Sequence, residues 1–350
     1  MINNPPSIVP RAVSYLLLAA FAMLAVLVYW PALSGPFLLD DLINIPQTRV
    51  DALSVEQLRE VALGNDSGRF GRSIPVLTFA LNYYFGGDGT FSFKLVNLAL
   101  HLCNALVLFF LLSSLLRVIK SGHESEGTIL QSVDVRLFSV LIAGIWMLHP
   151  LQLSAVMYVV QRMNMLSTFF TLLSLLLFVS LRTAQIQGTK AMSLRASLPA
   201  ATGVLLLVLF ACLSKENGAL AILYIGWIEF VVFRFRMNRE TVHYRYRNSV
   251  IAGGVMLFCL GCLYFYLNQA SLLHGYVIRD HSLVERLMTQ PGVVLFYIRQ
   301  ILLPDMGQMS LYIDDFGVAR ELGLKTVLSI AGIVLLGLVT LLARRSHPLI

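Results

Sequence analysis

Two adjacent carboxylates, Asp40 and Asp41, are the residues of this sequence best suited to acid–base chemistry. They directly follow three large apolar residues, Phe37, Leu38 and Leu39, near the end of a long apolar run. Carboxylates at such a boundary must lose part of their hydration, so the pair is typical of a general base or a metal ligand at the mouth of a cavity. A solvated helix cap or surface pair fits the same spacing, and the spacing alone leaves both interpretations open.

Several cations in or beside apolar runs could hold a phosphate group. Arg162 lies inside an apolar run, where a charge costs about 3 kcal/mol and is usually paired or faces a cavity, although its side chain could also reach the nearer surface. Arg69 and Arg72 could bind a phosphate bidentately, or could simply contact lipid headgroups. Lys215 and Glu216 could neutralise each other; alternatively, Lys215 binds phosphate while Glu216 orients it or contacts a sugar hydroxyl.

A further set of polar residues lies shortly before Arg162 or in the long segment 268–325. Five of them could contact a sugar or a phosphate: His149, Gln152, Gln161, Tyr297 and Arg299. A second group, Asn97, His101 and Asn104, recurs at one-turn spacing within an apolar run. For this stripe, hydrogen bonding between helices is the better interpretation than ligand binding.

No cofactor is required by the sequence. The four cysteines all lie in apolar runs and lack the spacing of a metal site, so we interpret them as small apolar residues: Cys103, Cys212, Cys259 and Cys262. Asp40 and Asp41 could bind a divalent cation, but the pair alone does not demand one.

The elements that must position these residues are membrane helices. Apolar residues make up 57% of the chain and charged residues only 13%, whereas soluble proteins carry roughly a quarter charged residues. Because a spanning helix needs about 20 apolar residues, we predict an all-α polytopic bundle of about eight or nine spanning helices in a single domain, residues 1–350. The first run is predicted to be an uncleaved helix rather than a signal peptide. The runs are 14–33, 91–116, 135–148, 155–181, 198–213, 219–233, 250–267 and 326–342.

The lysines and arginines between the runs predict the orientation of the chain. If the runs alternate, the gaps that contain Arg117, Arg136, Arg182 and residues 234–247 fall on one side, which is then the cytoplasm. The net charge of +7 is therefore explained by orientation and by contact with anionic membrane lipids rather than with nucleic acid. The opposite side receives two long loops, 34–90 and 268–325, and the short turns near His149 and Lys215. All of the candidate acids and phosphate-binding cations gather on that external side.

The two long loops are predicted to contain helices at the membrane surface. Ser54–Leu63 reads as an amphipathic helix with Ser54 as N-cap and Gln57 completing a capping box. Residues 74–85 are apolar but short and end in aromatic residues, which favours a helix along the membrane surface. Residues 292–303 are predicted to form an interfacial or re-entrant helix rather than a full crossing.

These motifs, taken in order, resemble one protein family. The stretches that carry the resemblance are 37–41, 71–75 with 81–83, 95–97 with His101, 149–152 with 158–162, 213–216 and, more loosely, 297–315. Over roughly residues 25–320 the chain resembles the membrane portion of the transmembrane and tetratricopeptide-repeat-containing glycosyltransferases and their bacterial relatives. That family belongs to the GT-C class of polyprenyl-phosphate-sugar-dependent glycosyltransferases. The chain stops at Ile350 without such repeats, as a short bacterial-type member or a fragment would.

The resemblance implies a GT-C fold and a polyprenyl-phosphate-sugar donor, with a protein or a cell-surface glycan or lipid as acceptor. It implies an inverting transfer at the external face, in the periplasm if the protein lies in a bacterial inner membrane. Asp40 or Asp41 would be the base, Arg162 and Lys215 would stabilise the phosphate, and Arg72 and His149 would assist. Two other classes stay open from the residues alone: a lipid or solute transporter, and a non-catalytic membrane assembly protein.

Overall fold

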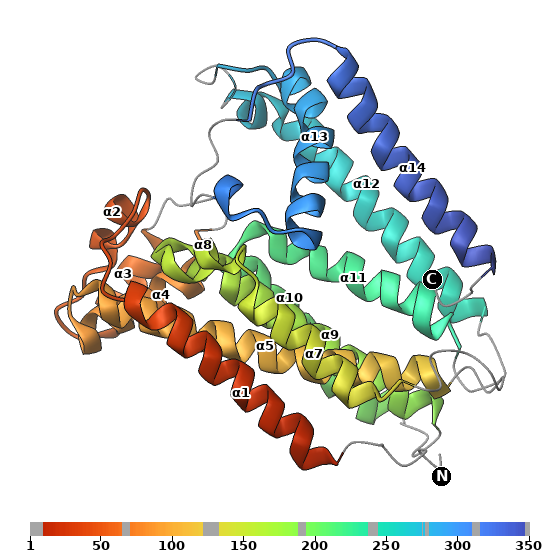
Figure 1. Ribbon diagram of the computed structural model, residues 1–350, viewed down its shortest axis with the longest axis horizontal. Helices are drawn as coiled ribbons and strands as arrows, with labels where there is room; N and C mark the ends of the chain where they lie inside the picture. Colours follow the sequence, from red (N-terminus) through yellow and green to blue (C-terminus); the bar gives the residue numbers. More distant parts are fainter. Residues whose placement is uncertain are drawn as a thin grey trace. The chain divides into compact units, whose positions relative to one another are not determined.

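The protein, seen in a computed structural model, is described over residues 10–64, 71–121, 133–187, 194–236, 244–274, 276, 280–309 and 316–346. Within these ranges the regular structure is helical and contains no strand (Figure 1). The chain forms two compact units, Met1–Arg247 and Asn248–Ile350. The all-α prediction is confirmed for the described ranges.

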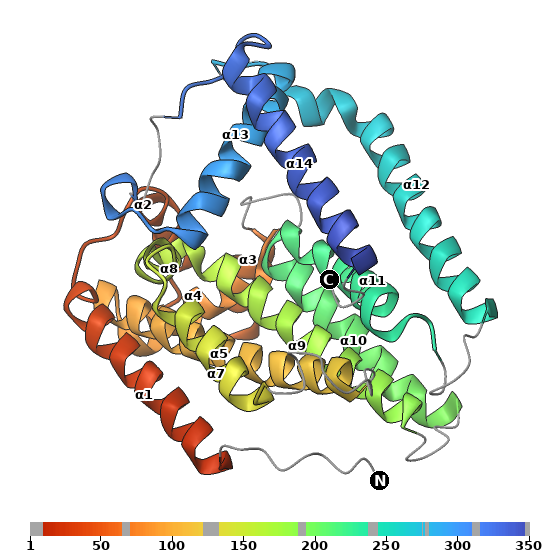
Figure 2. The same ribbon diagram turned by 45° about the vertical axis from the view of Figure 1, so that its right-hand side comes forward.

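The first unit is built on a layer of long helices, which Figure 2 shows from a turned view. In this layer α1 packs on α7, α7 on α5, α5 on α9, and α9 on α10. Their bounds are α1 Arg11–Tyr29, α5 Thr90–Ser121, α7 Val135–Leu148, α9 Arg162–Ile186 and α10 Leu194–Ser214. Shorter elements connect them: η1 Trp30–Ala32, α2 Asp41–Asn44, η2 Pro46–Thr48, α3 Val55–Leu63, α4 Ser73–Gly86, α8 Gln152–Met157, η3 Val159–Gln161, η4 Glu216–Ala219, α11 Leu220–Ile228 and the π-helical turn η5 Glu229–Phe233.

The second unit contains a helical hairpin in which α13 packs against α14. Its elements are the greater part of α12 (Tyr244–His274), α13 (Leu283–Leu302), η6 (Met306–Gln308) and α14 (Leu324–Ser346). Helix α13 begins with a complete capping box between Ser282 and Glu285, so it starts well before the apolar stretch predicted at residues 292–303. Pro291 lies inside this helix without ending it.

Six of the described helical segments are long and apolar enough to cross a membrane, so the protein is a membrane protein with several candidate spans. They are Arg11–Ala32, Thr90–Ser121, Val159–Ile186, Glu216–Phe233, Tyr244–Ala270 and Leu324–Leu342. Two further predicted runs form apolar helices that are shorter, Val135–Leu148 and Pro199–Ser214. A helix of 14 residues rises only about 21 Å, which is less than the apolar thickness of a typical bilayer.

The polar stripe of α5 makes the predicted hydrogen bonds between helices. Asn97 Nδ2 donates to the Val156 carbonyl at 3.2 Å, and Asn104 Nδ2 donates to the Met165 carbonyl at 3.1 Å. The His101 ring nitrogen Nε2 lies 2.9 Å from the Met147 carbonyl oxygen. All three side chains are buried, and this interpretation of the stripe is confirmed.

The first-loop helix α3 begins where the sequence predicts. The Ser54 hydroxyl accepts a hydrogen bond from the Gln57 N–H at 3.1 Å, which confirms the N-cap. The capping box is wrong in one detail, because the Gln57 side chain accepts from the Ala52 N–H instead of from Ser54. The cap therefore ties the helix to the preceding turn.

Candidate active site

The two aspartates of the first loop occupy different environments. The Asp41 carboxylate is completely buried and accepts hydrogen bonds from the N–H groups of Leu38 (3.1 Å), Val159 (3.2 Å) and Val160 (2.7 Å). Burial raises the pKa of Asp41, and the three N–H donors partly oppose that shift. Asp41 therefore joins the turn of residues 38–41, which we call the acid turn, to η3. It has little capacity left to accept a proton from a substrate.

Asp40 is exposed, and its backbone is held by a tyrosine that lies 118 residues later in the sequence. The Asp40 N–H donates to the Tyr158 hydroxyl at 3.0 Å. Burial, with a contribution from the Asp40 carboxylate, raises the pKa of Tyr158 to about 12, so the phenol stays protonated at neutral pH. Leu39, the residue before, has a positive φ of 46°, a conformation that costs an L-residue about 1 kcal/mol and is often found near functional sites. The turn presents one exposed carboxylate on a fixed backbone.

Lys94 binds the backbone just before the acid turn. It was not among the residues that the sequence predicts for the site. Its side chain is 2% exposed, and Nζ donates to the carbonyl oxygens of Gly35 (2.9 Å) and Pro36 (3.1 Å). The Lys94 charge also interacts with that of Asp41. A lysine four residues into an apolar helix was a usable signal, but its acceptors are carbonyl groups that no residue type reveals.

Arg162 lies deep in the first unit and is almost saturated with neutral acceptors. Nε donates to Asn97 Oδ1 at 2.7 Å, and Nη2 donates to Asn82 Oδ1 at 2.7 Å and to the Phe93 carbonyl at 2.8 Å. Nη1 donates to the carbonyl of Thr78 at 3.2 Å. Because the side chain is 1% exposed, this geometry does not favour the predicted contact with phosphate. Arg162 instead ties α4 and α5 to the start of α9.

Arg72, Lys215 and Glu216 come together and form a cluster with two cations and one anion. Arg72 Nη2 lies 3.2 Å from Glu216 Oε2, and Nη1 donates to the Met163 sulfur at 3.4 Å. Burial and the Arg72 charge lower the pKa of Lys215, while Glu216 acts in the opposite direction. The Arg72 and Glu216 side chains are 24% and 33% exposed, so the cluster is within reach of a ligand. One carboxylate cannot neutralise two cations, and an anion would be attracted there.

Backbone geometry holds both halves of this cluster. Arg72 adopts a left-handed conformation, φ 41° and ψ 44°, immediately before α4. On the other half, η4 lies so close to the end of α10 that a Cβ on Gly218 would stand 2.2 Å from the Ala211 carbonyl carbon. Only glycine fits this contact, and the contact fixes Lys215 and Glu216 at the start of η4.

The acid turn and the cation cluster flank one hydrophobic cluster. Its buried members are Ile45, Phe79, Phe93, Tyr158, Val159, Val160 and Met163, with Phe37, Leu38 and Tyr83 packed against them. Tyr158 holds Asp40, and Met163 contacts Arg72. The first unit therefore links the predicted base and the predicted cation Arg72 through one hydrophobic cluster.

The predicted substrate contacts are only partly gathered here. Gln161 accepts from Asn164 Nδ2, and Asn164 Oδ1 lies 3.5 Å from Asn217 Nδ2, so a ladder of amide side chains leads to the residue after Glu216. His149 ends α7, where its ring nitrogen Nδ1 accepts from the Leu151 N–H at 3.2 Å. Gln152 begins α8, and its own N–H donates to the His149 carbonyl at 2.9 Å.

Three predicted residues cannot be placed with this site. Arg69 lies outside the described residues. Tyr297 and Arg299 belong to the second unit, on α13, where Arg299 Nη2 lies 3.9 Å from Asp305 Oδ2. Within the described ranges, no group of three or more His, Cys, Asp or Glu side chains is placed to hold a metal ion.

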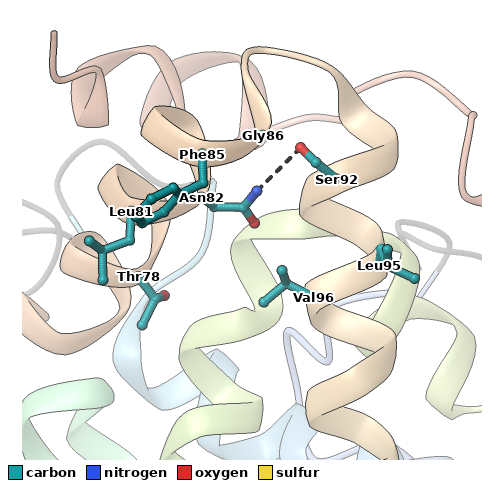
Figure 3. Close-up of a pocket in the computed structure, with 8 residues that line it drawn as sticks. All are labelled: Thr78, Leu81, Asn82, Phe85, Gly86, Ser92, Leu95 and Val96. Carbon is teal, nitrogen blue, oxygen red and sulfur yellow. Dashed lines mark hydrogen bonds between the residues drawn. The ribbon is translucent and has the colours of Figure 1, made fainter.

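An apolar groove runs between α4 and α5, beside the residues that hold Arg162 (Figure 3). Its volume is about 500 Å³. Asn82 lies at its base, donating to Ser92 Oγ at 3.2 Å while its Oδ1 accepts from Arg162. The lining residues are Thr78, Leu81, Asn82, Phe85, Gly86, Ser92, Leu95 and Val96. Such a surface suits an apolar chain.

Comparison of the chain with protein-family models, with curated proteins and with solved structures found no match. The family resemblance stays a prediction from the order and spacing of the motifs. The acid turn, the cation cluster and the groove are the features of the molecule that bear on its function.

Proposed function

We propose that this protein is a membrane glycosyltransferase of GT-C type with about eight or nine spanning helices. The six candidate spans and the two shorter apolar helices of the described ranges would supply eight of them. The protein transfers a sugar from a polyprenyl-phosphate donor to an acceptor hydroxyl on the external face of the membrane. In a bacterial inner membrane that face is the periplasmic one. The observation that carries the proposal is that one hydrophobic cluster, through Tyr158 and Met163, links the exposed Asp40 carboxylate to a partly exposed cluster of net positive charge.

The proposed reaction uses these two features in one displacement. Asp40 accepts the proton of the acceptor hydroxyl as its oxygen forms a bond to the anomeric carbon. The bond between that carbon and the phosphate oxygen breaks, and the lipid phosphate leaves with the electron pair. Arg72 and Lys215 stabilise the negative charge that grows on the phosphate, and the attack inverts the configuration at the anomeric carbon.

The donor's lipid chain also has a plausible place. The α4–α5 groove is walled by apolar side chains such as Leu81, Phe85 and Val96, which suits an isoprenoid chain. Arg72 immediately precedes α4, so phosphate and lipid chain would be held at the same helix. This arrangement supports a donor with one charged end and one apolar end.

The test is transfer of a labelled sugar from a polyprenyl-phosphate donor by the purified protein. Asp40→Asn is expected to lower the rate about 100-fold or more, as loss of a general base does. Asp51→Asn is the matched control, because Asp51 lies in the same loop with an exposed side chain that pairs only loosely with Arg49 at 3.7 Å. An Asp40→Asn enzyme as active as the wild type would remove Asp40 as the base.

Transport is the second candidate function, and one observation favours it. Arg182 and Glu229 form a buried ion pair inside two candidate spans, and intramembrane charges often line a transport path. Single cysteines at positions 215 and 182, in a chain without its native cysteines, would separate the two proposals. A transporter exposes both positions to polar reagents from opposite sides of the membrane, whereas a transferase exposes only position 215.

A further inference from the structure

Three arginines lie at helix ends of the first unit that are remote from α2. Arg11 begins α1, Arg117 lies near the end of α5, and Arg136 lies in the first turn of α7. These helix ends lie away from α2 in both views (Figures 1 and 2). Helix α1 has 19 residues and rises roughly 28 Å before the acid turn, so Arg11 lies about the apolar thickness of a bilayer from that turn.

Side-chain contacts pack the three helices against one another. The Tyr15 ring of α1 lies 6.2 Å from the Phe109 ring of α5, and the Phe21 ring of α1 fills the space beside Gly144 of α7. The charge of Arg117 interacts with those of both Arg136 and Arg11. Arg11 and Arg136 therefore both repel Arg117, and the three helix ends form one corner of the unit.

Among the residues that the structure describes, the three arginines form no ion pair. Arg117 Nε donates only to the Ser113 carbonyl, at 2.8 Å, and the buried Nη1 of Arg136 has no hydrogen-bond partner. The neighbouring Asp134 carboxylate accepts from the N–H groups of Arg136 and Leu137 as the N-cap of α7.

Two serine hydroxyls near the arginines also lack a hydrogen-bond partner. Ser14 lies one turn after Arg11, and Ser113 lies one turn before Arg117. Both side chains are buried, and neither hydroxyl has a hydrogen-bond partner. Buried polar atoms are nearly always satisfied, so several unsatisfied donors in one corner indicate a missing anionic or polar group.

We propose that Arg11, Arg117 and Arg136 bind the phosphate of an anionic phospholipid. Helices α1 and α5 are candidate spans, so their ends lie at headgroup depth, where anionic lipids concentrate. A phosphate offers several acceptor oxygens to three guanidinium groups for which the only described acceptor is the Ser113 carbonyl. A lipid is favoured over a free phosphate because exposed apolar side chains of α1, Tyr15 and Leu16 among them, lie beside the arginines to receive acyl chains. The proposal does not depend on the glycosyltransferase reaction.

The test is lipid binding to the full chain in detergent. Native mass spectrometry measures the binding, and thermal unfolding measures the change in Tm. Phosphatidylglycerol is expected to bind the wild type about tenfold more tightly than phosphatidylcholine and to raise its Tm. An Arg117→Gln/Arg136→Gln variant is expected to lose that preference. Arg49→Gln is the control, because Arg49 is an exposed arginine in the acid-turn loop, and it should keep the preference.

Three results would overturn the proposal. They are equal binding of the two lipids by the wild type, an unchanged preference in the double variant, and an equal rise in Tm with glycerol phosphate alone. If the double variant does not fold, Arg117→Lys and Arg136→Lys keep the charge but lose the planar fork of donors. Each lysine variant should then bind phosphatidylglycerol severalfold more weakly, and wild-type binding by both would also contradict the proposal.

Discussion

The two ends of α9 bury an arginine in two different ways. Arg162, at the first residue, donates only to carbonyl and amide oxygens, whereas Arg182, roughly 30 Å along the helix, forms a bidentate pair with Glu229 at 2.7 and 2.8 Å. The charge is therefore neutralised at one end and left uncompensated at the other. The uncompensated end is the one that also carries Arg72 and Lys215. The charge within reach of an anion at that end comes from Arg72 and Lys215, because the one carboxylate of Glu216 cannot neutralise both.

The largest loss of stability is expected when the ion pair between Arg182 and Glu229 is broken. Arg182→Met leaves the Glu229 carboxylate buried without its partner and should lower the free energy of unfolding by about 3–5 kcal/mol. The measurement is chemical unfolding in detergent. Adding Glu229→Leu to this variant should recover much of the loss, because the double variant buries no charge. Equal stability of the single and double variants would contradict the ion-pair account.

The same substitution at the other end should cost less. Arg162→Met leaves neutral acceptors unsatisfied, chiefly Asn82 Oδ1 and Asn97 Oδ1, and should cost about 2–3 kcal/mol under the same conditions. A loss greater than that of Arg182→Met would mean that the two ends are not distinguished by charge compensation.

A smaller effect is expected from the contact that fixes the cation cluster. Gly218→Ala places a methyl group against the backbone of α10 and should cost about 1–3 kcal/mol, with weaker anion binding as η4 moves. Gly226→Ala is the matched control, since a Cβ at Gly226 meets no atom within 4 Å, and it should be neutral or slightly stabilising. Equal effects of the two substitutions in a thermal-unfolding measurement would show that the η4–α10 contact is not tight.

The smallest effect concerns the pH dependence of the acid turn. Burial raises the pKa of Asp41 in the folded protein above its ordinary value of about 3.9, so the folded state holds the proton more tightly. The stability from this group is fully present below that ordinary value and is lost as the pH rises through the raised folded value. Asp41→Asn should remove this fall from the curve of unfolding free energy against pH. If the curve for Asp41→Asn keeps the shape of the wild-type curve, the fall in stability does not come from Asp41.

The sequence predicts those features that depend on local pattern. The cap at Ser54 and the polar stripe at Asn97, His101 and Asn104 are confirmed because each follows from spacing along one helix. The ends of helices are predicted less accurately from the apolar pattern. Helix α13 begins at its capping box, well before the apolar stretch that starts at residue 292.

Partners that lie far apart in the sequence were not predictable in the same way. Arg182 reads as an orienting charge at a helix end, and that interpretation is incomplete because Glu229, 47 residues later, forms a buried pair with it. Likewise, the separate environments of Asp40 and Asp41 arise from Tyr158 and the N–H groups after it, which only the folded chain brings near. Backbone donors carry no residue-type signal.

The most direct test of the central claim is equilibrium binding of a sugar-free polyprenyl phosphate to the purified protein. The account predicts that Arg72→Gln and Lys215→Gln each weaken binding about tenfold or more, because each removes a charge-assisted contact to the phosphate. Arg49→Gln, an exposed cation of the first loop, should leave binding unchanged. Binding of the Arg72 and Lys215 variants with wild-type affinity would contradict the claim that this end of the protein holds a lipid phosphate.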